Sequence, residues 1–164
     1  MQIRYKHHVD SMDAKILQVL QQDAALPIAA VAEAVGLSVT PCWRRIRKLE
    51  EAGVIKSRVT LLDRKAAGIG VVVFASVSLV RHTEETVAEF DAFVAQRPEI
   101  LEAHAVSGER DYQLKIAVCD IEQYEGFLNR DLLALSCIAS VNSRFMLREI
   151  KYTTALPLVA AEGG

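Results

Sequence analysis

A cluster of four cations occupies residues 44–48, and its residue types suit contact with a nucleic acid. An arginine guanidinium can bridge O6 and N7 of a guanine or hold a phosphate through two hydrogen bonds. Just ahead of the cluster, Thr40 can donate a hydrogen bond to a phosphate or a base. Trp43 can pack against a sugar, or it can belong to the boundary of the protein core. Arg45 also has an alternative, because it could pair with Glu50 or with an acid of an earlier helix.

Three helices must position this cluster, and the sequence marks their ends. The first begins at Asp10 or Ser11, either of which can cap a helix, and breaks near residue 23. The second begins at Pro27, because proline suits a first helical turn, and is closed by Gly36. The third follows Ser38 as its N-cap and runs to about residue 52. A short helix, a glycine-containing turn and a longer helix make a helix-turn-helix.

The third helix separates apolar side chains from cationic ones. At about 100° per residue, one face carries Val39, Cys42, Ile46 and Leu49. The opposite side carries Thr40, Arg44, Arg47 and Lys48. A helix held by such an apolar face can enter a major groove with its N-terminal residues nearest the bases. The residues expected to contact DNA are Ser38, Thr40, Pro41, Trp43, Arg44, Arg45, Arg47 and Lys48.

Composition excludes several other classes of protein. The chain has 164 residues, of which 51% are hydrophobic, so it is not intrinsically disordered. No stretch approaches the roughly 18 to 20 apolar residues of a membrane-spanning helix, and the N-terminus lacks the apolar region of a secretory signal. Cys42, Cys119 and Cys137 are isolated, which argues against a disulfide framework or a zinc site. We expect a soluble, cytoplasmic protein without metal, cofactor or membrane partner.

Charge is distributed unevenly along the chain. Residues 1–64 carry ten Lys or Arg against seven Asp or Glu, whereas residues 65–164 carry nine against fourteen. The net charge of −2 therefore conceals a basic first part and an acidic second part. This asymmetry suggests that only the first part meets a polyanion.

The second part alternates strand and helix signals. Period-two apolar patterns predict strands over residues 71–79, 100–106, 112–118 and 139–151, with a further strand and linker from residue 54. Thr83 and Asp120 can each cap a helix. The order β-α-β-β-α-β is that of ferredoxin-like folds. We expect both helices to cover one face of the sheet, and the other face to be apolar enough to associate with a partner.

The motifs in both parts resemble those of the Lrp/AsnC family of bacterial and archaeal transcription regulators. In the first part the matching residues are Val9-Asp10-x-Met12-Asp13-x-Lys15-Ile16-Leu17 and Gly36-Leu37-Ser38-x-Thr40-Pro41-Cys42-Trp43-Arg44-Arg45-Ile46-x-Lys48-Leu49-Glu50-x-x-Gly53-Val54-Ile55. In the second part, the residues Ser107-Gly108-Glu109-Arg110-Asp111-Tyr112 resemble the Gly-x-x-Asp-Tyr signature of the ligand-sensing RAM domain. The resemblance implies a homodimer that assembles to a tetramer or octamer, with an amino acid bound between dimers.

The resemblance also places the effector site. A carboxylate such as Asp111 can hold the ammonium of an amino acid, and the backbone N–H groups of a glycine turn can hold its carboxylate. The residues implied are Gly108, Glu109, Asp111 and Tyr112, with Ser143 and Phe145 as weaker candidates. The alternative is that Gly108 only makes a hairpin turn and that Asp111 is a charge at the edge of a strand.

These observations predict an α+β regulator that binds double-stranded DNA. The expected parts are a flexible tail (1–8), a winged-helix-like helix-turn-helix domain (9–53), a strand and linker (54–69), a ferredoxin-like RAM domain (70–158) and a second tail (159–164). The sequence contains no paired catalytic residues, no phosphate-binding loop and no metal-ligand spacing, so we do not expect an enzyme. A ligand sensor with a vestigial DNA-binding part is the remaining alternative, and the cations at 44–48 argue against it.

Overall fold

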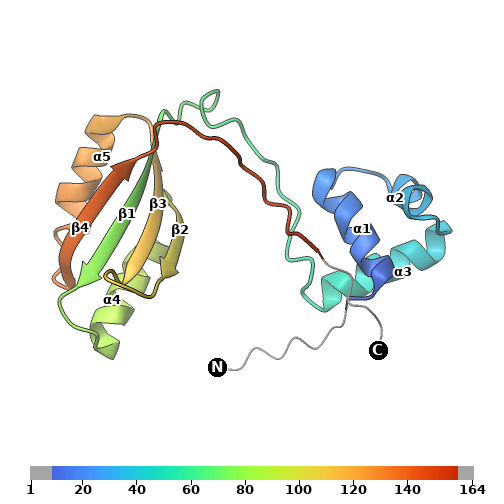
Figure 1. Ribbon diagram of the computed structural model, residues 1–164, viewed down its shortest axis with the longest axis horizontal. Helices are drawn as coiled ribbons and strands as arrows, with labels where there is room; N and C mark the ends of the chain where they lie inside the picture. The colour runs from blue at the N-terminus through green and yellow to red at the C-terminus, as the bar shows by residue number, and fades with distance from the viewer. Residues whose placement is uncertain (1–8, 159–164) are drawn as a thin grey trace. The chain divides into compact units, whose positions relative to one another are not determined.

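The computed structural model describes residues 9–158, so both expected tails lie outside the described residues. The chain forms two compact units. Of the described residues, one unit contains 9–60 together with 151–158, and the other is Leu61–Ile150. Figure 1 shows the three helices of the first unit and the sheet with its helices in the second.

The first unit is the expected helix-turn-helix. Its helices are α1 (Ser11–Gln22), α2 (Ile28–Val35) and α3 (Val39–Glu51). Asp10 caps α1 in a reciprocal capping box with Asp13. Gly36 ends α2 with a φ of 72°, a left-handed conformation that glycine adopts without a steric cost. The core between the helices is formed by Ile16, Val31, Ala32, Val35, Cys42 and Ile46.

The C-terminal segment from Lys151 onward packs with this first unit. The Gln21 side chain of α1 contacts this segment. Its Nε2 donates to the carbonyl oxygen of Leu156 at 3.3 Å, and its Oε1 accepts from the Leu156 N–H at 2.6 Å. A side-chain amide thus satisfies both backbone groups of Leu156, as a neighbouring strand would.

The strand expected from residue 54 is absent, because residues 54–62 of the described chain adopt no strand pairing. The first regular strand is β1, which begins at Val71. An extended segment becomes a strand only when another segment completes its ladder of hydrogen bonds, and a hydropathy pattern cannot show whether that happens.

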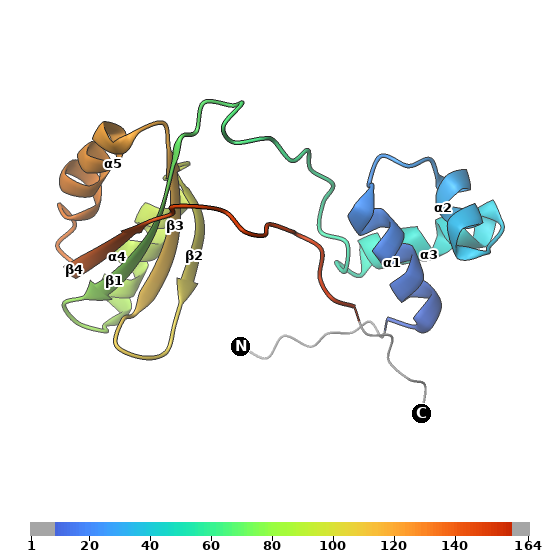
Figure 2. The same ribbon diagram turned by 45° about the horizontal axis from the view of Figure 1, so that its top comes forward.

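The second unit is the expected β-α-β-β-α-β fold. Its elements are β1 (Val71–Leu79), α4 (Glu84–Ala95), β2 (Ile100–Ala105), β3 (Tyr112–Val118), α5 (Ile121–Phe127) with the π-helical turn η1 (Leu128–Leu132), and β4 (Ile138–Phe145). The strand order is β2-β3-β1-β4, and the three neighbouring pairs are antiparallel (Figure 2). Strand β4 ends six residues earlier than expected, because its last paired residue, Phe145, lies opposite Val73 near the start of β1.

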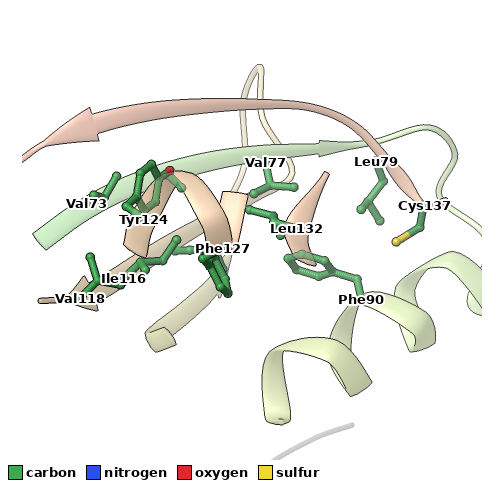
Figure 3. Packing of buried hydrophobic residues seen from close by; sticks show 12 residues of the cluster. Val73, Val77, Leu79, Phe90, Ile116, Val118, Tyr124, Phe127, Leu132 and Cys137 are labelled. Carbon is green, nitrogen blue, oxygen red and sulfur yellow. The ribbon is translucent and has the colours of Figure 1, made fainter. Parts of the chain in front are cut away.

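One face of the sheet and both helices form the core of this unit (Figure 3). The buried strand residues are Val73, Ala75, Val77, Leu79, Leu114, Ile116 and Val118. The helices contribute Phe90 from α4 and Tyr124 and Phe127 from α5, and Leu132 follows from η1. The apolar alternation of the strands therefore faces the helices, as the sequence predicts.

The opposite face of the sheet is mainly polar, although it carries Phe74, 38% exposed, so the expected apolar outer face is not what the structure shows. The Ser76 hydroxyl lies 2.9 Å from Gln113 Oε1, and Arg144 Nη2 donates to the same hydroxyl at 3.4 Å. Nearby, Lys115 pairs with Glu102 at 2.8 Å.

Candidate nucleic-acid interface and effector site

The recognition helix α3 is held by an apolar underside. Cys42, Ile46 and Leu49 are buried, as their spacing predicted, and burial raises the pKa of the Cys42 thiol. Val39 was expected on the same face, but half of its surface is exposed. It is the first residue of α3, where the helix has not yet reached the buried core.

Arg45 links α3 to α1 through two carboxylates. Its Nη1 lies 2.6 Å from Asp10 Oδ2 and 2.7 Å from Asp13 Oδ1. The Asp13 backbone N–H and the Arg45 guanidinium both hold the pKa of Asp10 below its ordinary value. Hydrogen bonds to Asp10 and Asp13 raise the pKa of Arg45 in turn. The alternative of an ion pair with an acid of the first helix is therefore what the structure shows, and Arg45 orients α3.

The other cations of the cluster face outward. Arg44, Arg47 and Lys48 are all exposed. Arg47 makes only loose contacts with two acids of its own helix, at 3.8 Å to Glu50 and 3.6 Å to Glu51. Exposed pairs of this kind contribute little to stability, so they leave Arg47 available to a stronger anion.

The remaining candidates share this outward surface. Ser38, Thr40 and Pro41 are exposed, and Trp43 is 47% exposed rather than part of the core. Ser38 occupies the N-cap position, although its hydroxyl accepts no capping hydrogen bond from the described residues. One further group went unnoticed in the sequence: Lys56 and Arg58 follow α3, and they line a surface hollow beside Glu50. Their signal was the return of basic residues just after Gly53.

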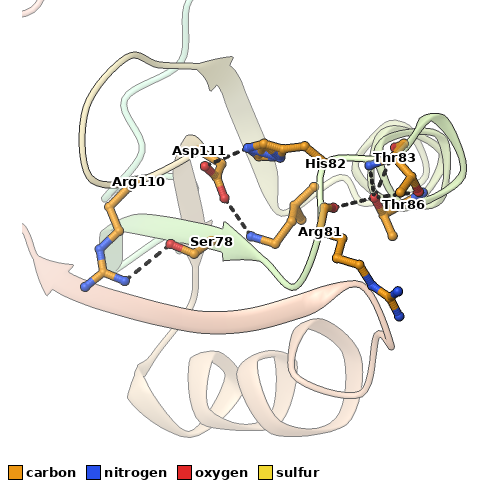
Figure 4. Close-up of polar contacts among 8 residues, drawn as sticks. Ser78, Arg81, His82, Thr83, Thr86, Arg110 and Asp111 are labelled. Carbon is orange, nitrogen blue, oxygen red and sulfur yellow. Dashed lines mark hydrogen bonds and ion pairs between the residues drawn. The ribbon is translucent and has the colours of Figure 1, made fainter.

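Asp111 lies at the end of the β2–β3 hairpin, and both of its carboxylate oxygens have partners (Figure 4). Oδ2 accepts from the Leu79 N–H at 2.8 Å, and Oδ1 lies 2.9 Å from His82 Nε2. Gly108 has a φ of 120°, which strongly favours glycine. The turn therefore has a structural role of its own: Asp111 connects the hairpin to the end of β1 and to the loop before α4.

Gly108, Glu109 and Tyr112 lie in or next to this turn, whereas Ser143 and Phe145 lie on β4, away from it. The Tyr112 ring packs on Phe90 with 4.5 Å between ring centroids, and burial, with nearby Asp91 and Asp111, raises the pKa of its phenol. Ser143 instead meets the Tyr124 hydroxyl at 2.5 Å, and Phe145 meets the Tyr124 ring edge-on at 5.4 Å. Within one chain, the candidates form two separate groups, one at the hairpin and one beside α5.

Residues 9–158 hold neither a metal-binding cluster nor a membrane-spanning helix. This part of the chain has no cluster of His, Cys, Asp or Glu arranged to hold a metal ion. None of its helices is both long and apolar enough to cross a membrane.

A helix-turn-helix with outward cations, followed by a ferredoxin-like unit, defines a class of two-part DNA-binding proteins. Residues 9–56 match the winged helix-turn-helix DNA-binding family, and residues 72–156 match the Lrp/AsnC ligand binding domain. The chain belongs to the Lrp/AsnC family of transcription regulators, which are not enzymes.

Individual relatives agree with this assignment over nearly the full chain. The chain is 37% identical to the DNA-binding transcriptional activator DecR of Escherichia coli, over 92% of this chain and 99% of DecR. A transcriptional regulator from Neisseria meningitidis, solved with L-Met, superposes with a TM-score of 0.87 at 37% identity, covering 90% of this chain and 96% of that one. An AsnC family regulator from Agrobacterium tumefaciens gives a TM-score of 0.86 at 44% identity, with the same coverage of 90% and 96%.

Proposed function

We propose that the protein is a sequence-specific regulator of amino-acid metabolism genes that responds to an amino acid bound between its dimers. Recognition helix α3 enters the major groove, and Ser38, Thr40, Pro41, Trp43, Arg44, Arg47 and Lys48 meet bases and phosphates. Arg45, the remaining DNA candidate from the sequence, acts by holding the helix in place. The protein acts in the cytoplasm, where a regulator of this kind meets its operator.

The observation that carries the DNA-binding proposal is that one arginine of α3 is ion-paired within the protein while two others are exposed. Arg45 forms ion pairs with Asp10 and Asp13 at the start of α1. Arg44 and Arg47 are exposed to solvent. A solvated basic helix needs no such arrangement. A helix that binds in a groove needs an internal ion pair of this kind, because its orientation must be fixed while its exposed cations contact the DNA.

Exposed apolar side chains support association between copies of the chain. Leu62 is 76% exposed in the segment before β1, and Leu147 and Ile150 are 98% and 85% exposed in the segment after β4. Such side chains in extended segments are costly in water, and a second copy would cover them. Two linked recognition helices would then bind adjacent grooves with an affinity increased by effective concentration.

The effector proposal rests on the hairpin turn and on the Neisseria relative, whose structure contains L-Met. The Asp111 carboxylate could take the ammonium, but only in place of His82, which now lies against Oδ1. Gly108, Glu109 and Tyr112 flank it. Because Ser143 and Phe145 lie in a different group, they would reach the effector only from another copy. An effector held between dimers shifts their arrangement through its differential affinity for the alternatives.

The test is to select DNA from a random-sequence pool with the full-length protein and to measure binding by mobility shift. Each of the twenty amino acids is added in turn. We expect a preferred sequence to emerge and at least one amino acid to change the affinity or the stoichiometry of the complex. Equal binding to all sequences would contradict the regulator proposal. A preferred sequence with no response to any amino acid would contradict the effector.

A further inference from the structure

Val39 and Trp43 form an apolar stripe along the flank of α3, between its buried face and its outward cations. They are four residues apart, so they lie one above the other on a single face of the helix. Val39 is 50% exposed and Trp43 is 47% exposed, and neither is among the buried core residues of the helix-turn-helix. Arg47 continues the row a further turn along. Two apolar side chains, each about half exposed, therefore lie beside the surface that carries the cations.

The stripe lies at the end of the helix where base contacts are expected. Val39 begins α3 and Trp43 is its fifth residue, and the N-terminal residues of a recognition helix come nearest the base edges. Thr40 and Arg44 project from the neighbouring strip of the same helix. Cations and a hydroxyl match the phosphates and the polar base edges. The apolar side chains of the stripe need a different partner on the DNA, one that is itself apolar.

The major groove has one strongly apolar feature, the C5-methyl group of thymine. We propose that Val39 and Trp43 recognise thymine methyl groups in the operator and so help to determine its sequence. This assignment rests on the DNA-binding role proposed above. Charge complementarity favours DNA as the occupant, because the exposed cations Arg44, Arg47 and Lys48 of the same helix would oppose an approaching basic surface.

The test removes the methyl groups without altering base pairing. An operator is selected from a random-sequence pool with the full-length protein, and each thymine is replaced in turn by uracil. The dissociation constant is measured by fluorescence anisotropy. Burial of one methyl group corresponds to about a fourfold change in affinity, so we expect that loss at one or more positions in each half-site.

Variants then connect the effect to the stripe. Val39→Ala and Trp43→Ala should bind the thymine operator more weakly, and the ratio of their affinities for thymine and uracil operators should fall toward one. Val106→Ala, another exposed valine outside α3, should keep the wild-type ratio. Thermal unfolding verifies folding, which should be maintained because both side chains of the stripe are exposed.

The outcomes distinguish failure of the thymine-methyl assignment from failure of the proposed sequence-specific DNA binding. A preferred operator that is indifferent to uracil at every position would overturn the assignment alone. So would variants that keep the wild-type ratio while changing the oligomeric state, because the stripe would then be a contact between copies. Failure to select any preferred sequence would overturn the sequence-specific function and the assignment together.

Discussion

Arg45 Nη1 lies 2.7 Å from Asp13 Oδ1, so the third residue of α1 orients the recognition helix. Asp13 is almost fully buried, with 7% of its side chain exposed, whereas 37% of the Arg45 side chain is exposed. Asp10, which caps α1, completes the arrangement at 2.6 Å. One of the four cations in the cluster is therefore part of the scaffold that lets the others reach outward.

Removal of Arg45 should destabilise the helix-turn-helix. A buried carboxylate loses a charge-assisted hydrogen bond, which costs about 2 kcal/mol in the free energy of unfolding. We expect Arg45→Ala to lower the midpoint of urea denaturation followed by circular dichroism. Arg44→Ala, on the exposed side of the same helix, serves as the control and should change stability little. Equal stability of the two variants would contradict the role assigned to Arg45.

The same cluster predicts a pH dependence. Because the pKa of Asp10 is held below its ordinary value of 3.8, its ionised form stabilises the folded state. That contribution is complete above the ordinary value and is lost as the pH falls through the lowered one. Asp10→Asn keeps a capping side chain but does not titrate. Wild type should be more stable than this variant at neutral pH, and the difference should shrink as the pH falls below the ordinary pKa of 3.8. A difference independent of pH would contradict the prediction.

A feature of the fold could be predicted from the sequence when it is set by residues that are close together along the chain. The β-α-β-β-α-β order and the caps at Asp10, Thr83 and Asp120 follow from short patterns, and the structure confirms them. The missing strand before β1 and the early end of β4 depend on which segment pairs with which. A one-dimensional pattern does not contain that information.

The candidate sites show the same limit. The outward direction of Arg44 and Arg47 follows from helical periodicity, and the structure agrees. The hydrogen bonds of Asp111 with Leu79 and His82 join residues about 30 positions apart, so no local pattern in the sequence predicts them. Val39 was misplaced because periodicity assigns a face to a residue without showing where the packing partner ends.

The bond between Gln21 and Leu156 should hold the C-terminal segment on α1. Gln21→Ala removes both hydrogen bonds, and a net loss of about 1 kcal/mol corresponds to roughly fivefold faster exchange of the Leu156 amide hydrogen. Gln18→Ala, also on α1 but exposed, is the matched control. Hydrogen exchange followed by mass spectrometry measures both. Unchanged exchange in Gln21→Ala would show that other contacts hold the segment.

Asp111→Asn should abolish the effector response while sparing the fold. The asparagine carbonyl can still accept from the Leu79 N–H, but it lacks the charge that an ammonium requires. An amino acid at about 100 times its dissociation constant should stabilise wild type by roughly 2.7 kcal/mol, seen as a higher melting temperature. The variant should show no such shift, whereas Glu125→Gln on α5 should behave as wild type. An equal shift in Asp111→Asn would place the effector elsewhere.

The most direct test of the DNA-binding account is the salt dependence of operator affinity for wild type, Arg44→Ala and Arg47→Ala. Each phosphate contact contributes about 0.9 to the slope of log affinity against log salt concentration. We expect both variants to bind more weakly, and a variant that has lost a phosphate contact to show a slope reduced by about one. Arg130→Ala, an exposed arginine in the second unit, should match wild type. Binding curves for Arg44→Ala and Arg47→Ala that superpose on wild type at every salt concentration would contradict the account.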